Sequence, residues 1–243
     1  MTHDDHRIDA RDTRNLSWSM PAWNDLIEKY DLSELRGGGD LVVKAGDIAV
    51  ARTGDLMLGD EEYSALFRCV NMLRYSWPAL AQAFALIQQA SDADAVLDLE
   101  AAMPLSSDRS EFLKPERLAS LRDAMERRTA KEASALVSAE GVLMTGSRLL
   151  LSLKQVMDCS EAAWTQAEPK IKGHSVGKLF EAAANHLRHC EEWRLSGQLQ
   201  TRQRRSIEVL ATLIDEPIVG DRHSFGSSRS IEILGAVAGL SLV

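Results

Sequence analysis

The chain has 243 residues, of which 45% are hydrophobic and 26% are charged, and its formal net charge is −8. This length and composition exclude a chain that is disordered throughout, because enough apolar surface is present to form a core without disulfides or metals. The acidic balance also excludes attraction to nucleic acid by the charge of the whole molecule.

The distribution of charge and the spacing of the cysteines limit the kinds of site that the chain can contain. Residues 1–110 carry 10 basic and 19 acidic side chains, whereas residues 111–243 carry 18 and 17, so the second half is compatible with a local basic patch. Cys69, Cys159 and Cys190 show neither a CxxC nor a Cys/His ligand spacing. We therefore expect reduced thiols in a cytoplasmic protein that has no metal and no cofactor.

No targeting or membrane-spanning segment is predicted. The first 15 residues lack the apolar core of a secretory signal. The most apolar stretch, from Ile231 to Val243, is too short and too interrupted to cross a bilayer. We expect no membrane partner.

The N-terminal part divides into two small units. Residues 1–40 are expected to form a mobile segment with a short helix around Trp18 to Tyr30, ended by three consecutive glycines at 37–39. Residues 41–59 alternate short apolar runs with Gly-Asp turns, which predicts a small β-hairpin or three-stranded meander. Its strands are expected at 41–44, 48–51 and 56–58.

Helical periodicity dominates residues 60–243, which we predict to be a helical bundle domain. Aromatic residues are scarce, at 5%, and alanine and leucine are common, which favours helices over sheets. Pro78 is expected to restart or kink a helix that runs from Asp60 to about Gln89, and a separate helix is expected at 92–102. Further helices are predicted from Pro115 to Val156, with a break near 141–146, and at 175–194, 202–214 and the C-terminus. The fold class is all-α with a small N-terminal β element.

The segment from Glu181 to Trp193 carries the most unusual side chains. On a helix, an apolar stripe predicts a core-facing side, made of Val176, Leu179, Phe180, Ala183, Leu187 and Cys190. The other side joins Glu181, Asn185, Arg188 and Glu192 in one line and Asn185, His189 and Trp193 in another, with His186 at the flank. An amide, two imidazoles and a guanidinium together favour a functional site over a plain solvated face.

Three interpretations of this polar side stay open. It can be a surface with ordinary ion pairs around Arg188, which contribute little to stability. It can be a metal site of His186 and His189, although no carboxylate completes an ExxH pair. It can be an acid–base site, in which a histidine transfers protons and an arginine holds phosphate oxygens, so that a 2′-hydroxyl attacks the adjacent phosphate of RNA.

The run Asn185-His186-Leu187-Arg188-His189 on a late helix of an all-helical body resembles the HEPN superfamily. Members of that superfamily are dimeric helical domains, and many are ribonucleases of toxin–antitoxin and phage-defence systems. The resemblance implies that Arg188 holds phosphate, that His189 or His186 transfers protons, and that Asn185 and Glu192 orient them. In that superfamily an arginine precedes the histidine by four to six residues, whereas here Arg188 and His189 are adjacent.

A basic cluster follows this helix. Arg194, Arg202, Arg204 and Arg205 are either solvated charges at helix ends or a surface that binds the RNA backbone. His223, in a glycine- and serine-rich loop, is either solvated or a second proton-transfer group.

The sequence thus supports two hypotheses for function. The first is a HEPN-like homodimer that binds or cleaves RNA without a metal, with Arg194, Arg202, Arg204 and Arg205 on the substrate. The second is a non-enzymatic helical interaction or regulatory subunit, in which the polar stripe contacts a protein partner.

Overall fold

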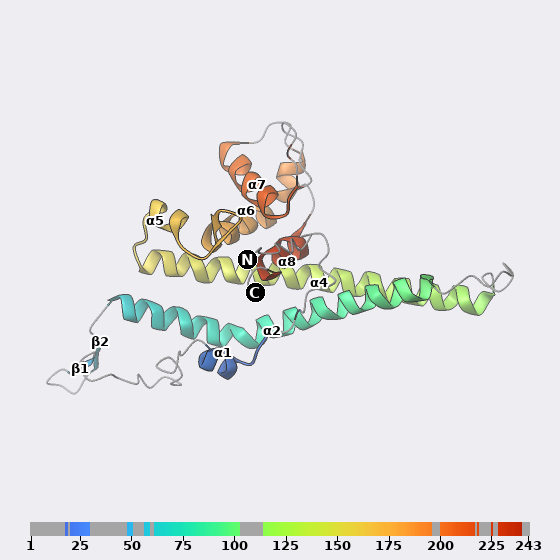
Figure 1. Cartoon of the computed structure of the whole chain (residues 1–243), viewed down its shortest axis with the longest axis horizontal. Coiled ribbons are helices and arrows are strands. Elements are labelled where there is room, and N and C mark those ends of the chain that lie inside the picture. The colour runs from blue at the N-terminus through green and yellow to red at the C-terminus, as the bar shows by residue number, and fades with distance from the viewer. Residues whose placement is uncertain are drawn as a thin grey trace, which may run out of the picture.

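The protein is mostly α-helical, as the sequence predicts (Figure 1). The structure is a computed structural model, and it describes residues 18, 20–29, 48–50, 56–58, 61–102, 114–195, 200–216, 218, 225 and 228–239. Seven helices and two pairs of very short strands lie in this part of the chain.

Two helices of 42 residues each form the longest feature of the molecule. Helix α2 (Glu61–Ala102) and helix α4 (Pro115–Val156) run antiparallel, side by side, as a long hairpin (Figure 1). The Nε of Arg128 lies 2.6 Å from Oδ1 of Asp94, which fixes the levels at which the two helices face each other. Each helix is about 63 Å long at about 1.5 Å per residue.

Both helices continue through the breaks expected from the sequence. Helix α2 includes Pro78 and residues 90–92, so the prediction of two separate helices there is wrong. Helix α4 runs unbroken through residues 141–146. The reason at Gly146 is packing, because a Cβ atom at this position would lie 2.3 Å from Cε1 of Phe180 in helix α6. This glycine permits a close approach of two helices and does not end one.

The N-terminal segment packs on α2. Helix α1 (Trp23–Lys29) lies beside it, with the rings of Trp23 and Trp77 at 5.4 Å and the Nε1 of Trp77 donating to the carbonyl of Pro21 at 3.0 Å (Figure 1). Trp18 is buried, with its ring 5.9 Å from that of Phe84. A short helix within 18–30 is therefore confirmed.

The structure describes two of the strands expected in the N-terminal β element. Strands β1 (Ile48–Val50) and β2 (Leu56–Leu58) pair antiparallel, with Ile48 opposite Leu58. The strand expected at 41–44 lies outside the described residues. A second, unpredicted hairpin joins β3 (Lys170–Ile171) and β4 (His174–Ser175) through Lys172 and Gly173, both with positive φ, as a two-residue primed turn requires.

The C-terminal helices gather on one side of α4 (Figure 1). They are α5 (Glu161–Gln166), which the sequence did not predict, α6 (Val176–Leu195), α7 (Thr201–Leu213) and α8 (Ser230–Gly239). Helix α6 lies between α4 and α7 and also contacts α8. Most of the core lies here, and Leu143, Leu179, Leu210 and Ile233 are fully buried in it.

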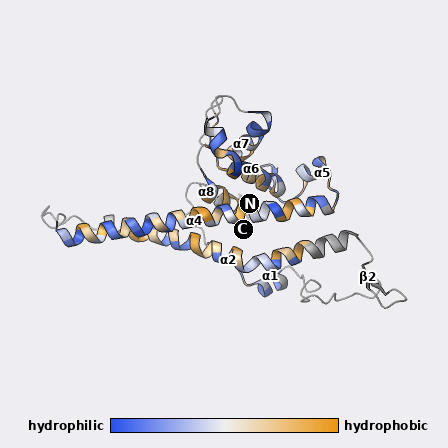
Figure 2. Ribbon diagram, turned by 180° about the vertical axis from the view of Figure 1, so that it is seen from behind, coloured by the Kyte–Doolittle hydropathy of each residue, from blue (hydrophilic) through white to orange (hydrophobic). Residues whose placement is uncertain are grey.

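The hairpin is less well covered than this C-terminal part. Charged side chains dominate the N-terminal part of α4, and apolar ones become common toward the middle of the helix (Figure 2). By length and composition alone α4 could cross a membrane, a test that core helices of soluble proteins also pass. Its most apolar 18-residue window is only 22% buried, so this segment differs from an ordinary core helix.

Candidate functional site

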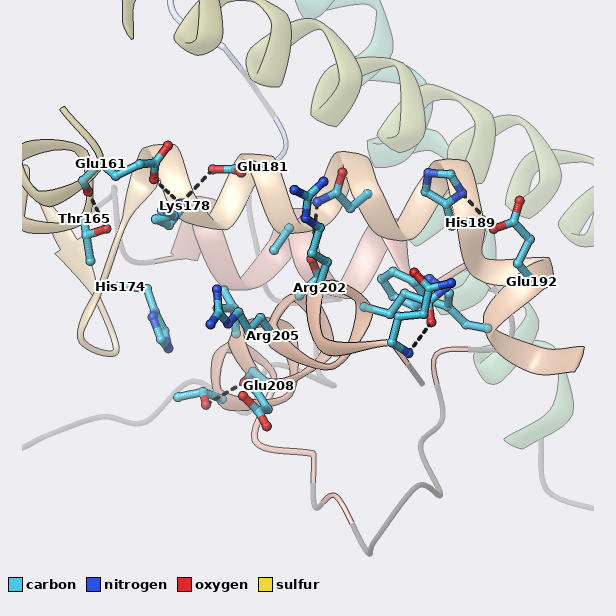
Figure 3. A pocket seen from close by; sticks show the side chains of 18 residues that line it. Glu161, Thr165, His174, Lys178, Glu181, His189, Glu192, Arg202, Arg205 and Glu208 are labelled. Carbon is cyan, nitrogen blue, oxygen red and sulfur yellow. Dashed lines mark hydrogen bonds and ion pairs between the residues drawn. The ribbon is translucent and has the colours of Figure 1, made fainter. Parts of the chain in front are cut away.

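A groove with a volume of about 1060 Å³ runs between α6 and α7 and reaches α5 (Figure 3). Half of the residues that line it are ionisable. The cationic ones are Lys178, Arg202 and Arg205, the acidic ones are Glu161, Glu181, Glu192 and Glu208, and the histidines are His174 and His189. The groove is thus nearly balanced in charge, and the arrangement of the charges decides what it can bind.

Local sequence fixes where its two main helices begin. Ser175 precedes α6, and its Oγ accepts a hydrogen bond from the backbone N–H of Lys178 at 3.3 Å, as an N-cap residue does. At the start of α7 the backbone N–H of Gln200 donates to Oε1 of Gln203 at 2.8 Å, one half of a capping box. These caps set which residues of each helix face the groove.

His189 and Glu192 form a pair on the α6 wall. Nδ1 of His189 lies 3.0 Å from Oε2 of Glu192, one helical turn further on (Figure 3). The two side chains are 45% and 66% exposed, so solvent or a ligand can reach both. A carboxylate on one ring nitrogen orients the imidazole and leaves Nε2 for a second partner.

The α7 wall supplies two arginines. Arg202 and Arg205 are one turn apart, exposed, and line the groove, and neither forms an ion pair with another residue that the structure describes. Nδ2 of Asn185 donates to Oγ of Ser206 at 3.3 Å and so links the two walls. Guanidinium groups that share a groove with an oriented imidazole, and that have no ion pair to a described residue, can hold an anion there.

At the opposite end of the groove, the charged side chains of α4, α5 and α6 form ion pairs with one another. Nζ of Lys178 lies 2.9 Å from Oε2 of Glu161 and 3.1 Å from Oε2 of Glu181 (Figure 3). Glu161 also pairs with Lys154 of α4. The hydrogen bonds from Lys154 and Lys178 lower the pKa of Glu161 from 4.5 to about 2. Burial alone lowers the pKa of Lys178, but its hydrogen bonds to Glu161 and Glu181 outweigh this and raise it. These charges join α5 to α4 and α6.

The structure does not bring Arg188 into the groove. Its guanidinium Nε donates to the carbonyl of Ala184 on its own helix at 3.1 Å, and Arg188 is not among the residues that line the groove. Of the three residues expected to act together, Asn185 and His189 line the groove and Arg188 does not.

His186 also lies away from the groove. It is fully buried, with its ring 5.4 Å from that of Trp193 and 5.5 Å from that of Phe225. This imidazole is part of the aromatic core under α6, where no substrate can reach it. Of the two candidate proton carriers, only His189 is accessible.

The basic cluster is divided by the structure. Arg202 and Arg205 line the groove, whereas Arg204 is exposed outside it. The side chain of Arg194 and the whole of His223 lie outside the described residues.

Lys178 and Glu161 are groove residues that sequence reasoning missed. The spacing of Lys178 and Glu181 is an ion-pair signal within one helix. Glu161 gave no such signal, because its partners Lys154 and Lys178 lie on other helices. Within the described residues, no group of three or more His, Cys, Asp and Glu side chains could hold a metal ion.

Comparisons with protein-family models, with curated proteins and with solved structures found no match to this chain.

Proposed function

We propose that the groove between α6 and α7 binds the phosphate backbone of RNA and that His189, oriented by Glu192, transfers the proton in its cleavage. The observation that carries the proposal is the placement of the His189–Glu192 pair in one groove with Arg202 and Arg205. Cleavage of a phosphodiester needs a group that transfers protons, such as an oriented imidazole, and cations that stabilise the phosphate oxygens, such as two guanidinium groups. The resemblance of the α6 segment to the HEPN superfamily supports the same choice of substrate.

In this mechanism Arg202 and Arg205 replace Arg188 as the phosphate-binding groups. With Nδ1 of His189 bonded to Glu192, Nε2 accepts the proton of a ribose 2′-hydroxyl as its oxygen forms a bond to phosphorus. The bond from phosphorus to the 5′-oxygen breaks, and that oxygen takes a proton from the imidazolium. The products are a 2′,3′-cyclic phosphate and a 5′-hydroxyl. The arginines stabilise the charge that grows on the phosphate oxygens.

Two features of the sequence-based hypothesis are part of this proposal. The protein is a cytoplasmic RNA-acting protein, of the kind found in toxin or phage-defence systems. Its helices belong to a bundle that is completed in a homodimer. The orienting role expected for Asn185 is replaced by a link between the two walls through Ser206.

The experiment compares binding and cleavage of total RNA and of a short single-stranded RNA, with and without chelator. We expect Arg202→Ala and Arg205→Ala each to weaken binding about 10-fold, since a charge-assisted hydrogen bond contributes about 1.5–3 kcal/mol. We expect His189→Gln to slow cleavage about 10²–10⁴-fold with binding retained. Arg204→Ala and Arg188→Ala are matched controls, because both side chains are exposed outside the groove.

Two outcomes would overturn the proposal in different ways. If wild-type protein neither binds nor cleaves RNA, RNA is not its substrate. Binding that depends on Arg202 and Arg205 without any cleavage removes the catalytic step and leaves an RNA-binding protein. The partly covered α2–α4 hairpin favours the second hypothesis, a helical interaction protein, if both activities are absent.

A further inference from the structure

His174 lines the same groove as His189 but enters it from a different element. It is the first residue of strand β4, so the turn of the β3–β4 hairpin places it just before α6. The residue is half-buried, and no hydrogen bond or ion pair links its ring to another described residue. An imidazole that faces a groove in this way has both of its ring nitrogens available to a ligand, one as a donor and one as an acceptor.

The hairpin that carries His174 is fixed to its neighbours on both sides of this residue. Nζ of Lys172, in the turn, pairs with Oδ2 of Asp215, which follows α7. Oγ of Ser175 donates to the carbonyl of Trp164 in α5 at 2.7 Å, and this hydrogen bond is buried. The hairpin is therefore joined to α5 and to the end of α7, and His174 has a fixed place at the edge of the groove.

Two side chains of α7 lie on the same side of the groove as His174. In Figure 3 the guanidinium of Arg205 points toward His174, and Glu208 lies close by on the same wall. Both are exposed, and neither forms an ion pair with another residue that the structure describes. Arg202 lies between this group and His189 (Figure 3). An imidazole and a carboxylate thus occur at both ends of the groove, with guanidinium groups between them.

The two imidazoles are too far apart to contact one phosphate. Helix α6 begins just after His174 and reaches His189 about 20 Å further along its axis, at about 1.5 Å per residue. Nucleotides of a stacked strand advance by about 3.4 Å each, so this distance corresponds to about six nucleotides, and to fewer in a more extended strand. A ligand that contacts both ends therefore carries several anionic groups in a row, as a nucleic-acid strand does.

We propose that His174 and Arg205 form a second phosphate subsite, which holds the RNA strand several nucleotides away from the phosphate that is cleaved at His189. The inference rests on the proposed function and refines it, because Arg202 is left for the cleaved phosphate and Arg205 is assigned to the distant one. A ring N–H and a guanidinium both donate hydrogen bonds to phosphate oxygens. Among the described residues a carboxylate bonds to the ring of His189 and none bonds to that of His174, so the subsite is assigned to binding and not to proton transfer.

The subsite makes affinity depend on the length of the strand. We expect wild-type protein to bind a single-stranded RNA of about 12 nucleotides at least about 10-fold more tightly than one of about 3 nucleotides, because only the longer strand reaches both ends. We expect His174→Ala to weaken binding of the longer RNA about 3- to 10-fold and that of the shorter RNA less than about 2-fold, because a short strand still has the His189 end. Fluorescence anisotropy of labelled RNA at one fixed salt concentration measures all four affinities.

Two further variants and the cleavage kinetics define the role of the subsite. Lys170→Ala is the matched control, because Lys170 belongs to the same hairpin and does not line the groove, and we expect it to bind both RNAs as wild type does. His174→Gln keeps a hydrogen-bond donor, and we expect it to restore part of the affinity for the longer RNA. In cleavage of the longer RNA, His174→Ala and Arg205→Ala should raise KM and leave kcat unchanged, whereas His189→Gln should lower kcat.

The outcomes separate this inference from the proposed function. If His174→Ala retains its helices by circular dichroism and binds the longer RNA as tightly as wild type, the subsite is wrong while the groove keeps its proposed function. Equal affinity of wild-type protein for the two lengths has the same consequence. A lower kcat in His174→Ala, with KM unchanged, would place His174 in the chemical step and overturn its assignment to a distant phosphate. If wild-type protein binds neither RNA, the proposed function is wrong and the subsite is wrong with it.

Discussion

Glu161 shows how a single exposed side chain joins three helices. It belongs to the six-residue helix α5, which is too short to be stable alone. Its carboxylate pairs with Lys154 of α4 and Lys178 of α6, and the adjacent Ser160 caps the helix by accepting from the N–H of Ala163 at 3.2 Å. The ring of Trp164 packs against Gly177, where a Cβ would lie 2.2 Å from it. The position of α5 at the end of the groove rests on these contacts.

The pKa of Glu161 gives a prediction of pH dependence. Because the folded pKa is lowered from 4.5 to about 2, the ionised form stabilises the fold above pH 4.5, and this stabilisation is lost as the pH falls toward 2. We expect Glu161→Gln to lower the melting temperature at pH 7 and to differ little from wild type near pH 2. Since the Glu161 side chain is 68% exposed, the difference at pH 7 should shrink in 1 M salt. A gap between the two proteins that is the same at both pH values would contradict this account.

At the scale of one element, helix α2 survives a proline in its interior. Pro78 removes the N–H that would bond to the carbonyl of Arg74, and its ring crowds that carbonyl, which together cost about 3 kcal/mol in a free helix. The helix persists because its contacts with α4 and the N-terminal segment extend on both sides of the proline. Tertiary packing therefore overrides a local signal that is strong by itself.

This cost can be measured. We expect Pro78→Ala to raise the free energy of unfolding by about 1–3 kcal/mol, because the exposed ring leaves no cavity and the new N–H restores a helical hydrogen bond. Pro115→Ala is the matched control, since Pro115 is the first residue of α4 and its missing N–H would have no helical partner. Urea denaturation of both variants should show a gain for the first and almost no change for the second. Equal changes in the two variants would mean that the hydrogen bond missing at Pro78 does not lower the stability of the protein.

At the scale of the whole molecule, a long hairpin carries a compact helical group on one side. The core lies mainly among α4, α6, α7 and α8, whereas most of α2 is only half-buried. The groove lies within this compact group, between α6 and α7.

If the protein is the homodimer of the proposed function, its stability must depend on concentration. We expect the melting temperature of wild-type protein to rise as its concentration increases, because association stabilises the folded state by mass action. Thermal unfolding followed by circular dichroism from about 1 to 100 µM measures this dependence. A wild-type melting temperature that does not change would contradict a dimer that contributes to folding.

The sequence alone determined the helical class, the short N-terminal helix, the hairpin of β1 and β2, and the polar character of Asn185, His189 and Glu192. These follow from composition, periodicity and turn residues, which act over a few neighbouring positions. It also selected Arg202 and Arg205, although together with Arg204, which lies outside the groove.

Only the tertiary structure decided which of these polar residues meet. His186 and Arg188 share a helix with His189, but His186 is buried and Arg188 bonds to the carbonyl of Ala184 and does not line the groove. Lys154, Glu161 and Lys178 come together from three helices, and Gly146 is explained by Phe180 rather than by its own neighbours in sequence. The physical reason is that a single helix presents several faces, and the face that becomes a site depends on which other helices pack against it.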